Sequence, residues 1–244
     1  MPAESFSRRI TRNILWNFVG QGWLVLLTFL ATPFMIHRLG IELYGIYVLV
    51  GILVDYLSFM QFGIVDAAVK YMTERLARGE PRRVQEIFWT AMLSQAGIGF
   101  AGALMILSLS AFLADHVFRV PKGLAQEVRL AVMIGAATFP LSMVTGVMTG
   151  TLRAIGRFDL LNMTGIAWGT LQTGAAVVML WSGLSLSAIL FSNLCMQLLC
   201  LVTLGALAGR LLPVTVPPAW SAAEMKQLLR FGGFITVSGF AGPI

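Results

Sequence analysis

The longest uncharged stretch of the chain covers residues 160–209, where no Asp, Glu, Lys or Arg occurs. As one helix it would be ~75 Å long, which is more than twice the ~30 Å hydrocarbon thickness of a bilayer. It must therefore fold back on itself, and Trp181-Ser182-Gly183 supplies the turn residues. This stretch predicts two antiparallel membrane-spanning helices, at about 161–181 and 185–208.

Charged residues divide the rest of the chain in the same way. Only 11% of the 244 residues are charged and 57% are hydrophobic, whereas soluble domains carry ~25% charged residues. The fold class that we predict is all-α: a polytopic membrane helix bundle of six transmembrane helices plus the start of a seventh. The other spans are expected at about 14–36, 43–69, 87–112 and 130–152. Residues 1–210 would then form an N-terminal six-helix lobe, 211–230 a cytoplasmic linker with Ser221 as a helix N-cap, and 231–244 a truncated start of the seventh helix.

The basic residues set the orientation. Most of the 17 Lys and Arg residues fall before residue 14, in 70–83, in 153–157 and in 210–230. These segments share one side of the membrane if the six spans are correct. Because basic residues concentrate in cytoplasmic loops, the N-terminus is predicted to be cytoplasmic. The net charge of +6 then reflects membrane topology, and a nucleic-acid partner is not expected.

Two carboxylates lie in the predicted second span. On one continuous helix, Asp55 and Asp66 would project within ~20° of each other. Lys70 follows Asp66 by four residues, so we expect these two to form an ion pair. Asp55 has no partner in its own helix. It is either a proton or cation site in a wet cavity, or a hydrogen-bonded carboxyl buried between helices.

Other polar residues in or beside the spans allow two interpretations. The amides are Asn17, Gln21, Gln172, Asn193 and Gln197. They either form hydrogen bonds between helices or line a shared polar cavity, and their occurrence on several spans favours the cavity. Arg153 and Arg157, at the inner end of the fourth span, either set the topology or attract an anionic phosphate head group.

Signals of catalysis are missing from the sequence. We find no D-x-D pair in a polar loop, no G-x-S-x-G motif, no Walker loop and no Cys/His cluster. We therefore expect no enzyme activity, no cofactor and no metal site. A membrane-embedded glycosyltransferase is an alternative, but the longest outer loop, about 113–129, is small for an active site.

Several short motifs resemble one family. They are Arg38-Leu39-Gly40, Tyr44-Gly45, Phe62-Gly63, Asp66-Ala67, Lys70-Tyr71 and Gly150-Thr151-Leu152-Arg153 with Gly156-Arg157-Phe158. In sequence and spacing they resemble the N-terminal part of bacterial polysaccharide biosynthesis proteins. These are the O-antigen and exopolysaccharide flippases of the multidrug/oligosaccharidyl-lipid/polysaccharide exporter superfamily.

The resemblance implies two lobes of about six helices around a central cavity. It implies that an undecaprenyl-diphosphate-linked oligosaccharide is flipped across the bacterial cytoplasmic membrane, with coupling to H⁺ or Na⁺. Membrane lipids, a polysaccharide polymerase and glycosyltransferases are the implied partners. Since the chain holds only one lobe, we expect a fragment of the full transporter. A cation-coupled multidrug antiporter of the same superfamily is the alternative.

On this hypothesis each candidate residue has a role. Arg153 and Arg157 would attract the diphosphate, and Asp55 would be the ion-coupling carboxylate. The cavity would be lined by Asn17, Gln21, Asp55, Gln172, Asn193 and Gln197.

Overall fold

The computed structural model describes residues 3–57, 61, 63–112, 125–212 and 217–241, with side chains for 18–57, 61, 63–110, 126–212 and 217–235. The regular elements in these ranges are helices: α1 (Ala3–Leu57), α2 (Ile64–Ala77), α3 (Pro81–Phe112), α4 (Ala125–Ala154), α5 (Phe158–Trp181), α6 (Leu186–Leu211) and α7 (Ala222–Ala241). Five helical segments are long and apolar enough to cross a membrane: Phe18–Leu57, Pro81–Ser110, Gln126–Ala154, Phe158–Trp181 and Leu186–Leu211. The predicted all-α membrane bundle is confirmed.

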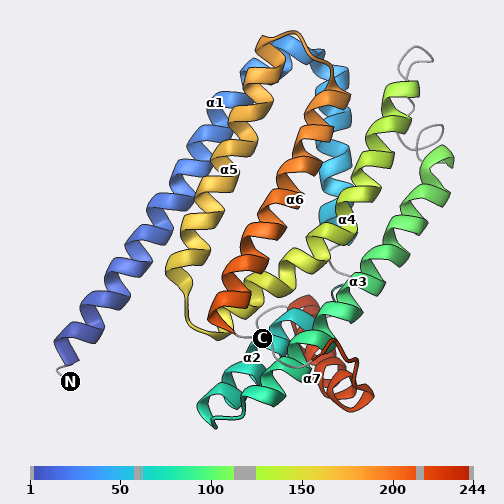
Figure 1. Cartoon of the computed structure of the whole chain (residues 1–244). Coiled ribbons are helices and arrows are strands. Elements are labelled where there is room, and N and C mark those ends of the chain that lie inside the picture. Colours follow the sequence, from blue (N-terminus) through green and yellow to red (C-terminus); the bar gives the residue numbers. More distant parts are fainter. Residues whose placement is uncertain (1–2, 58–60, 62, 113–124, 213–216, 242–244) are drawn as a thin grey trace.

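The longest of these elements, α1, consists of two helices that meet at Gly40. This residue has φ 79° and ψ 160°, a combination that essentially only glycine adopts without strain. The chain doubles back there, at the top of the bundle in Figure 1. The turn predicted between the first two spans is therefore present, and α1 supplies two antiparallel segments.

The second predicted span, 43–69, is wrong as a single helix. The second helix of α1 ends at Leu57 and α2 begins at Ile64, after Gly63 in the left-handed region at φ 63°. A left-handed residue interrupts the helical hydrogen-bond ladder and redirects the chain. Asp55 and Asp66 consequently lie on different helices and do not share a helix face.

At the bottom of Figure 1, α2, α7, the start of α3 and the end of α4 meet in an inner layer at the end of the bundle predicted to face the cytoplasm, which we call the inner end. Its core contains Ile64, Met72, Ile87 and Leu228, all at most 1% exposed. A separate core joins the second helix of α1 to α4 and to the start of α6. The short, amphipathic α2 is thus held in place by packing against its neighbours and does not cross the membrane alone.

Residues 217–224 fasten the start of α7 to α3. The indole N–H of Trp220 donates to Ser94 Oγ at 3.0 Å, and the backbone N–H of Ser221 donates to Thr90 Oγ1 at 3.3 Å. Ser221 Oγ accepts from the backbone N–H of Glu224 at 3.4 Å, which confirms the predicted N-cap. The expected division at 230 differs from the structure, because α7 continues without a break from Ala222 to Ala241.

A substitution at Gly63 tests the contact between α2 and α7. A Cβ at Gly63 would collide with the backbone of Gly232, whereas a Cβ at Gly79, which also has a positive φ, would meet nothing within 4 Å. We expect Gly79→Ala to cost only the backbone strain, about 1–2 kcal/mol. Gly63→Ala should cost about 1–3 kcal/mol more, because the two helices must move apart.

The measurement is the unfolding free energy of each variant in the same detergent. Equal losses of stability in the two alanine variants would contradict the close approach of α2 and α7.

Candidate functional site

Asp66 is paired with Arg153, which corrects the expected Asp66–Lys70 pair. Arg153 Nη1 donates to Asp66 Oδ1 at 3.3 Å, and this bond joins α2 to α4. Lys70 instead lies 3.9 Å from Glu74 Oε1. The reason is the change of chain direction at Gly63, after which α2 packs against α4. Gly150 of α4 leaves room there for the side chain of Val65. The pair is half-exposed at the inner end of the bundle.

Arg157 also has a carboxylate partner. It precedes α5, and its Nε and Nη2 donate to the two oxygens of Asp159, each at 3.0 Å. This hydrogen-bonded pairing raises the pKa of Arg157 above the usual guanidinium value, so the side chain stays charged at physiological pH. Both arginines predicted to attract a phosphate therefore already neutralise an acid. Each keeps N–H groups that these bonds do not use, because a guanidinium has five.

Two of the predicted amides connect helices. Gln197 Nε2 of α6 donates to Thr145 Oγ1 of α4 at 3.2 Å, and a side-chain hydrogen bond links Asn193 of α6 with Tyr47 of α1. Thr145 in turn donates to the carbonyl of Leu141 at 2.7 Å. These contacts support the interpretation that Asn193 and Gln197 join helices, because a polar group in hydrocarbon requires a partner.

Gln21 lies in a groove between α1 and α5. The groove has a volume of about 350 Å³ and is lined by Gly20, Gln21, Leu24, Leu161, Asn162, Gly165 and Ile166. The two helices approach closely, because Cβ atoms at Gly20 and Gly169 would overlap Ile166 and Leu24. The indole N–H of Trp23 also donates to Thr170 Oγ1 at 2.9 Å. The structure thus brings the amides of Gln21 and Asn162 to one groove.

Asp55 is exposed and lies two residues before the end of α1. It is ~22 Å along the helix from the turn at Gly40, a distance within the ~30 Å hydrocarbon thickness. Within the ranges whose side chains are described, Asp55 has no ion pair or hydrogen bond to another residue. Gln172 on α5 is exposed as well. The side chain of Asn17 lies outside the described residues.

The predicted residues consequently form separate pairs. The contacts described above place Arg153 with Asp66, Arg157 with Asp159, Gln197 with Thr145, Asn193 with Tyr47, and Gln21 beside Asn162. Sequence reasoning did not find Asp66 or Tyr47 as partners, because both pairs join helices distant in sequence. The side chains of Asp55 and Gln172 are exposed on the surface of the bundle.

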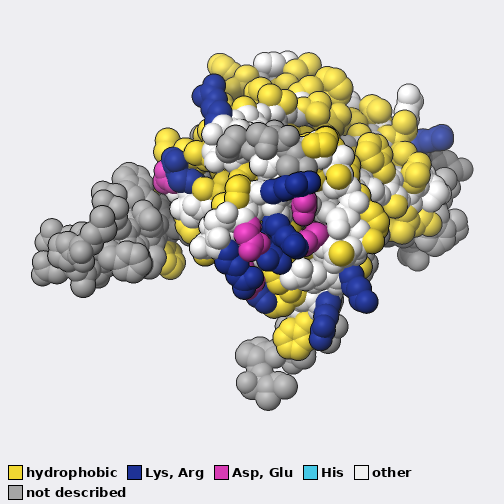
Figure 2. Space-filling model, turned by 60° about the horizontal axis from the view of Figure 1, so that its bottom comes forward, with side chains coloured by type: hydrophobic (Ala, Val, Ile, Leu, Met, Phe, Trp, Pro, Cys, Tyr) yellow, Lys and Arg dark blue, Asp and Glu magenta, His cyan; other side chains and the backbone are white. Residues whose placement is uncertain are grey.

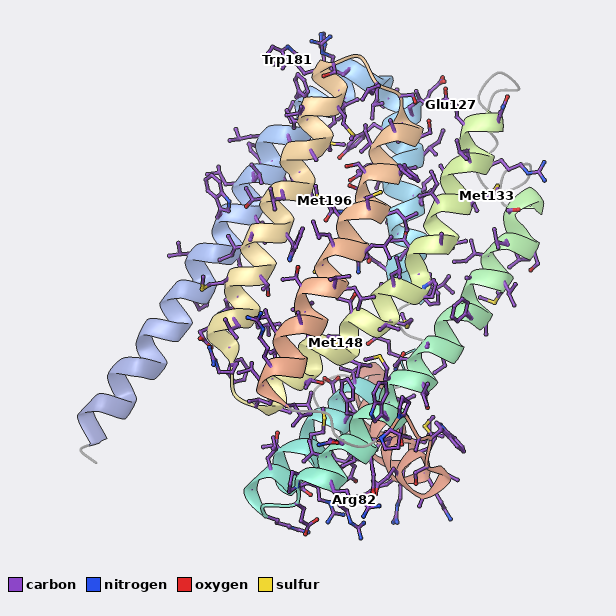
Figure 3. The ribbon with its side chains drawn as sticks, viewed as in Figure 1. Arg82, Glu127, Met133, Met148, Trp181 and Met196 are labelled. Carbon is purple, nitrogen blue, oxygen red and sulfur yellow. The ribbon has the colours of Figure 1, made fainter. Side chains whose placement is uncertain are left out.

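Charged side chains gather at the inner end of the molecule. Figure 2 shows Lys and Arg mixed there with Asp and Glu. The described ion pairs include Arg75–Glu80 at 2.9 Å, Arg82–Glu86 at 3.6 Å and Arg83–Glu224 at 3.8 Å. Figure 3 places Arg82 at this end and Trp181 at the opposite end. Because basic residues concentrate on the cytoplasmic side of membrane proteins, this placement of the charged end supports a cytoplasmic N-terminus.

Groups that could hold a metal ion are not found in the described part of the chain, where no three His, Cys, Asp or Glu side chains come together. Cys195 and Cys200 are free thiols. Among the candidate residues, the arrangement offers hydrogen-bonding amides, the unpaired carboxylate of Asp55, and Arg153 and Arg157 at the inner end. These groups suit binding and translocation of a polar or anionic molecule.

Comparison with known proteins gives a consistent result. The family model described as "Polysaccharide biosynthesis protein" matches residues 10–244. A protein of Bacillus subtilis (strain 168), named "Uncharacterized membrane protein EpsK", is 28% identical over 138 residues. This match covers 57% of the present chain and 26% of that protein, so the matched part spans about a quarter of its relative's length. No solved structure matches significantly.

Double-mutant cycles test the assignment of partners to Asp66. We expect the cycle of Asp66→Asn with Arg153→Gln to show a coupling of about 0.2–1 kcal/mol in unfolding free energy, as for other half-exposed pairs. The matched cycle of Asp66→Asn with Lys70→Gln should show none. Coupling found only in the Lys70 cycle would show that Asp66 pairs with Lys70 within α2, as the sequence predicted, and would contradict the Asp66–Arg153 pair.

Proposed function

We propose a function for this chain from one premise: it belongs to the family of polysaccharide biosynthesis proteins. The chain is a multi-pass membrane protein that forms one lobe of a transporter. Its substrate is an undecaprenyl-diphosphate-linked oligosaccharide, which moves from the inner to the outer leaflet of the bacterial cytoplasmic membrane. The opposite wall of the substrate cavity comes from a second lobe.

The observation that carries the proposal is the exposed carboxylate of Asp55 near the end of α1. An ionised carboxylate that faces lipid within the hydrocarbon is costly, and such residues in membrane proteins face water-filled cavities or pair with another group. Asp55 has no such partner among the described side chains. We infer that it faces an aqueous cavity and that H⁺ or Na⁺ binding there drives the transport cycle.

The amides provide the rest of the wall. Gln21 and Asn162 share a groove between α1 and α5, and Gln172 is exposed higher on α5. Amide groups both donate and accept hydrogen bonds, as sugar hydroxyls do. In this proposal these three residues contact the oligosaccharide. Asn193 and Gln197, which bond to other helices, maintain the shape of the lobe.

Arg153 and Arg157 lie where a diphosphate would enter from the cytoplasm. Each holds a carboxylate at the inner end but retains free N–H groups that can contact phosphate oxygens. The diphosphate would therefore contact arginines that are already bonded to Asp66 and Asp159, so their positive charges are partly neutralised before it binds. We propose that this partial neutralisation keeps the initial contact weak enough for the substrate to proceed into the cavity.

A cation-coupled multidrug antiporter is the second candidate. The observation that favours it is a groove of about 530 Å³ along α1, lined by Leu24, Val25, Thr28, Phe29, Thr32 and Pro33. This predominantly apolar surface suits a hydrophobic drug better than a sugar. The two candidates differ in substrate but share the role of Asp55.

Replacement of Asp55 tests the proposed transport. In the full-length protein, Asp55→Asn removes the ionisable group with little change in size, and we expect at least a ~10-fold loss of surface polysaccharide in a complemented flippase-deficient strain. Glu42→Gln is the matched control, because Glu42 is also exposed but lies beside the turn at Gly40.

The comparison requires equal amounts of both variants in the membrane. Normal polysaccharide from Asp55→Asn would overturn the role of this carboxylate. Efflux of cationic dyes without complementation would favour the antiporter.

A further inference from the structure

A groove between α2 and α7 lies apart from the proposed substrate cavity. It has a volume of about 620 Å³ and is lined by Tyr71 of α2 and by Ala223, Lys226, Gln227, Arg230, Phe231 and Phe234 of α7. The α7 residues recur every three or four positions, so they share one face of the helix. This face is only partly covered by α2.

Two cations on this face have no acidic partner. Lys226 and Arg230 are exposed, and neither forms an ion pair with a described residue. They are four residues apart on one helix, where like charges repel each other. By contrast, Arg75, Arg82 and Arg83 at the same end each have a carboxylate within 4.0 Å. An anion in the groove would remove the repulsion between Lys226 and Arg230.

Aromatic side chains form the floor of the groove. The rings of Tyr71 and Phe231 meet edge to face with centroids 5.8 Å apart. The ammonium group of Lys70 lies 3.9 Å from the centroid of Phe231. Lys70 thus adds a third positive charge beside the aromatic floor of the groove. Its ammonium group also covers the face of the Phe231 ring, so that face is not open to a cationic head group.

The groove runs from a polar to an apolar environment. Residues after Arg230 carry no charge, and Phe234 is 71% exposed. Four helical residues separate Arg230 from Phe234 by ~6 Å along the axis. This spacing places a phosphate-binding end and a chain-binding end at adjacent depths, as in a phospholipid at the boundary between head groups and hydrocarbon.

We propose that this groove binds an anionic phospholipid of the cytoplasmic leaflet. Lys226 and Arg230 hold its phosphate, Lys70 adds positive charge, and an acyl chain lies against Phe234. Basic pockets on the cytoplasmic side of membrane proteins suit such head groups. The site does not depend on the proposed transport, since it shares no residue with the substrate cavity.

Native mass spectrometry of the full chain in detergent tests the proposal, with phosphatidylglycerol and phosphatidylcholine as probes. We expect phosphatidylglycerol to bind more tightly. The double variant Lys226→Gln/Arg230→Gln should lose affinity about 25-fold, since each basic residue near a membrane surface contributes about five-fold. The matched control Arg78→Gln/Arg82→Gln removes two exposed charges from the same end of the molecule and should change affinity less than about two-fold.

Further arms identify the source of the phosphate. Phe234→Ala should weaken binding of phosphatidylglycerol several-fold, and millimolar inorganic phosphate should not displace the lipid. Equal losses in the two double variants would show diffuse surface charge and overturn the site. Equal binding of phosphatidylcholine, or displacement by inorganic phosphate, would overturn the anionic-lipid assignment. The single variants Lys226→Gln and Arg230→Gln, both at exposed positions, repeat the test if the double variant does not fold.

Discussion

Hydrocarbon offers no partner to polar groups, and this constraint determines most of the structure. Every backbone N–H and C=O in the membrane must be satisfied within the protein, and the helices of this chain satisfy them within each segment. The same constraint explains why Gln197 and Asn193 bond to neighbouring helices, and why the described ion pairs gather at the inner end. The exposed side chain of Asp55 departs from this constraint. A departure of this kind at a single ionisable residue is the usual mark of a functional position in a membrane protein.

The inner layer depends on small residues that permit close packing. Gly63 approaches the backbone of Gly232, and Gly150 accommodates Val65. These contacts place α2 against both α7 and α4, and the Asp66–Arg153 pair follows from that placement. The groove with Lys226 and Arg230 is also a product of this packing, because α2 covers only part of the α7 face. One break in a helix therefore determines both a salt bridge and a binding surface.

Much of the architecture was predictable from charge and hydropathy. The uncharged stretch 160–209 placed α5 and α6 to within a few residues, and the turn at Gly40 followed from its flanking polar residues. The break before Ile64 was not predictable in this way, because its surroundings are as apolar as a span and only Gly63 marks it. Asp66 was assigned to Lys70 because local spacing is visible in a sequence, whereas the docking of α2 on α4 is not. The candidate cavity residues stay predictions, and the partners that the structure gives to Asn193 and Gln197 depend on packing between distant segments.

The attachment of residues 217–224 to α3 has a mechanical consequence. Trp220, Ser221 and Glu224 each contact α3, through Ser94, Thr90 and Arg83 respectively. The start of α7 is consequently tied to α3, while Gly232, about two turns further along α7, packs against Gly63 at the start of α2. A tilt of α3 relative to α1 and α5 would therefore carry α7 with it, and α2 as well. The inner ends of α2, α3 and α7 are in this way expected to move together as one unit.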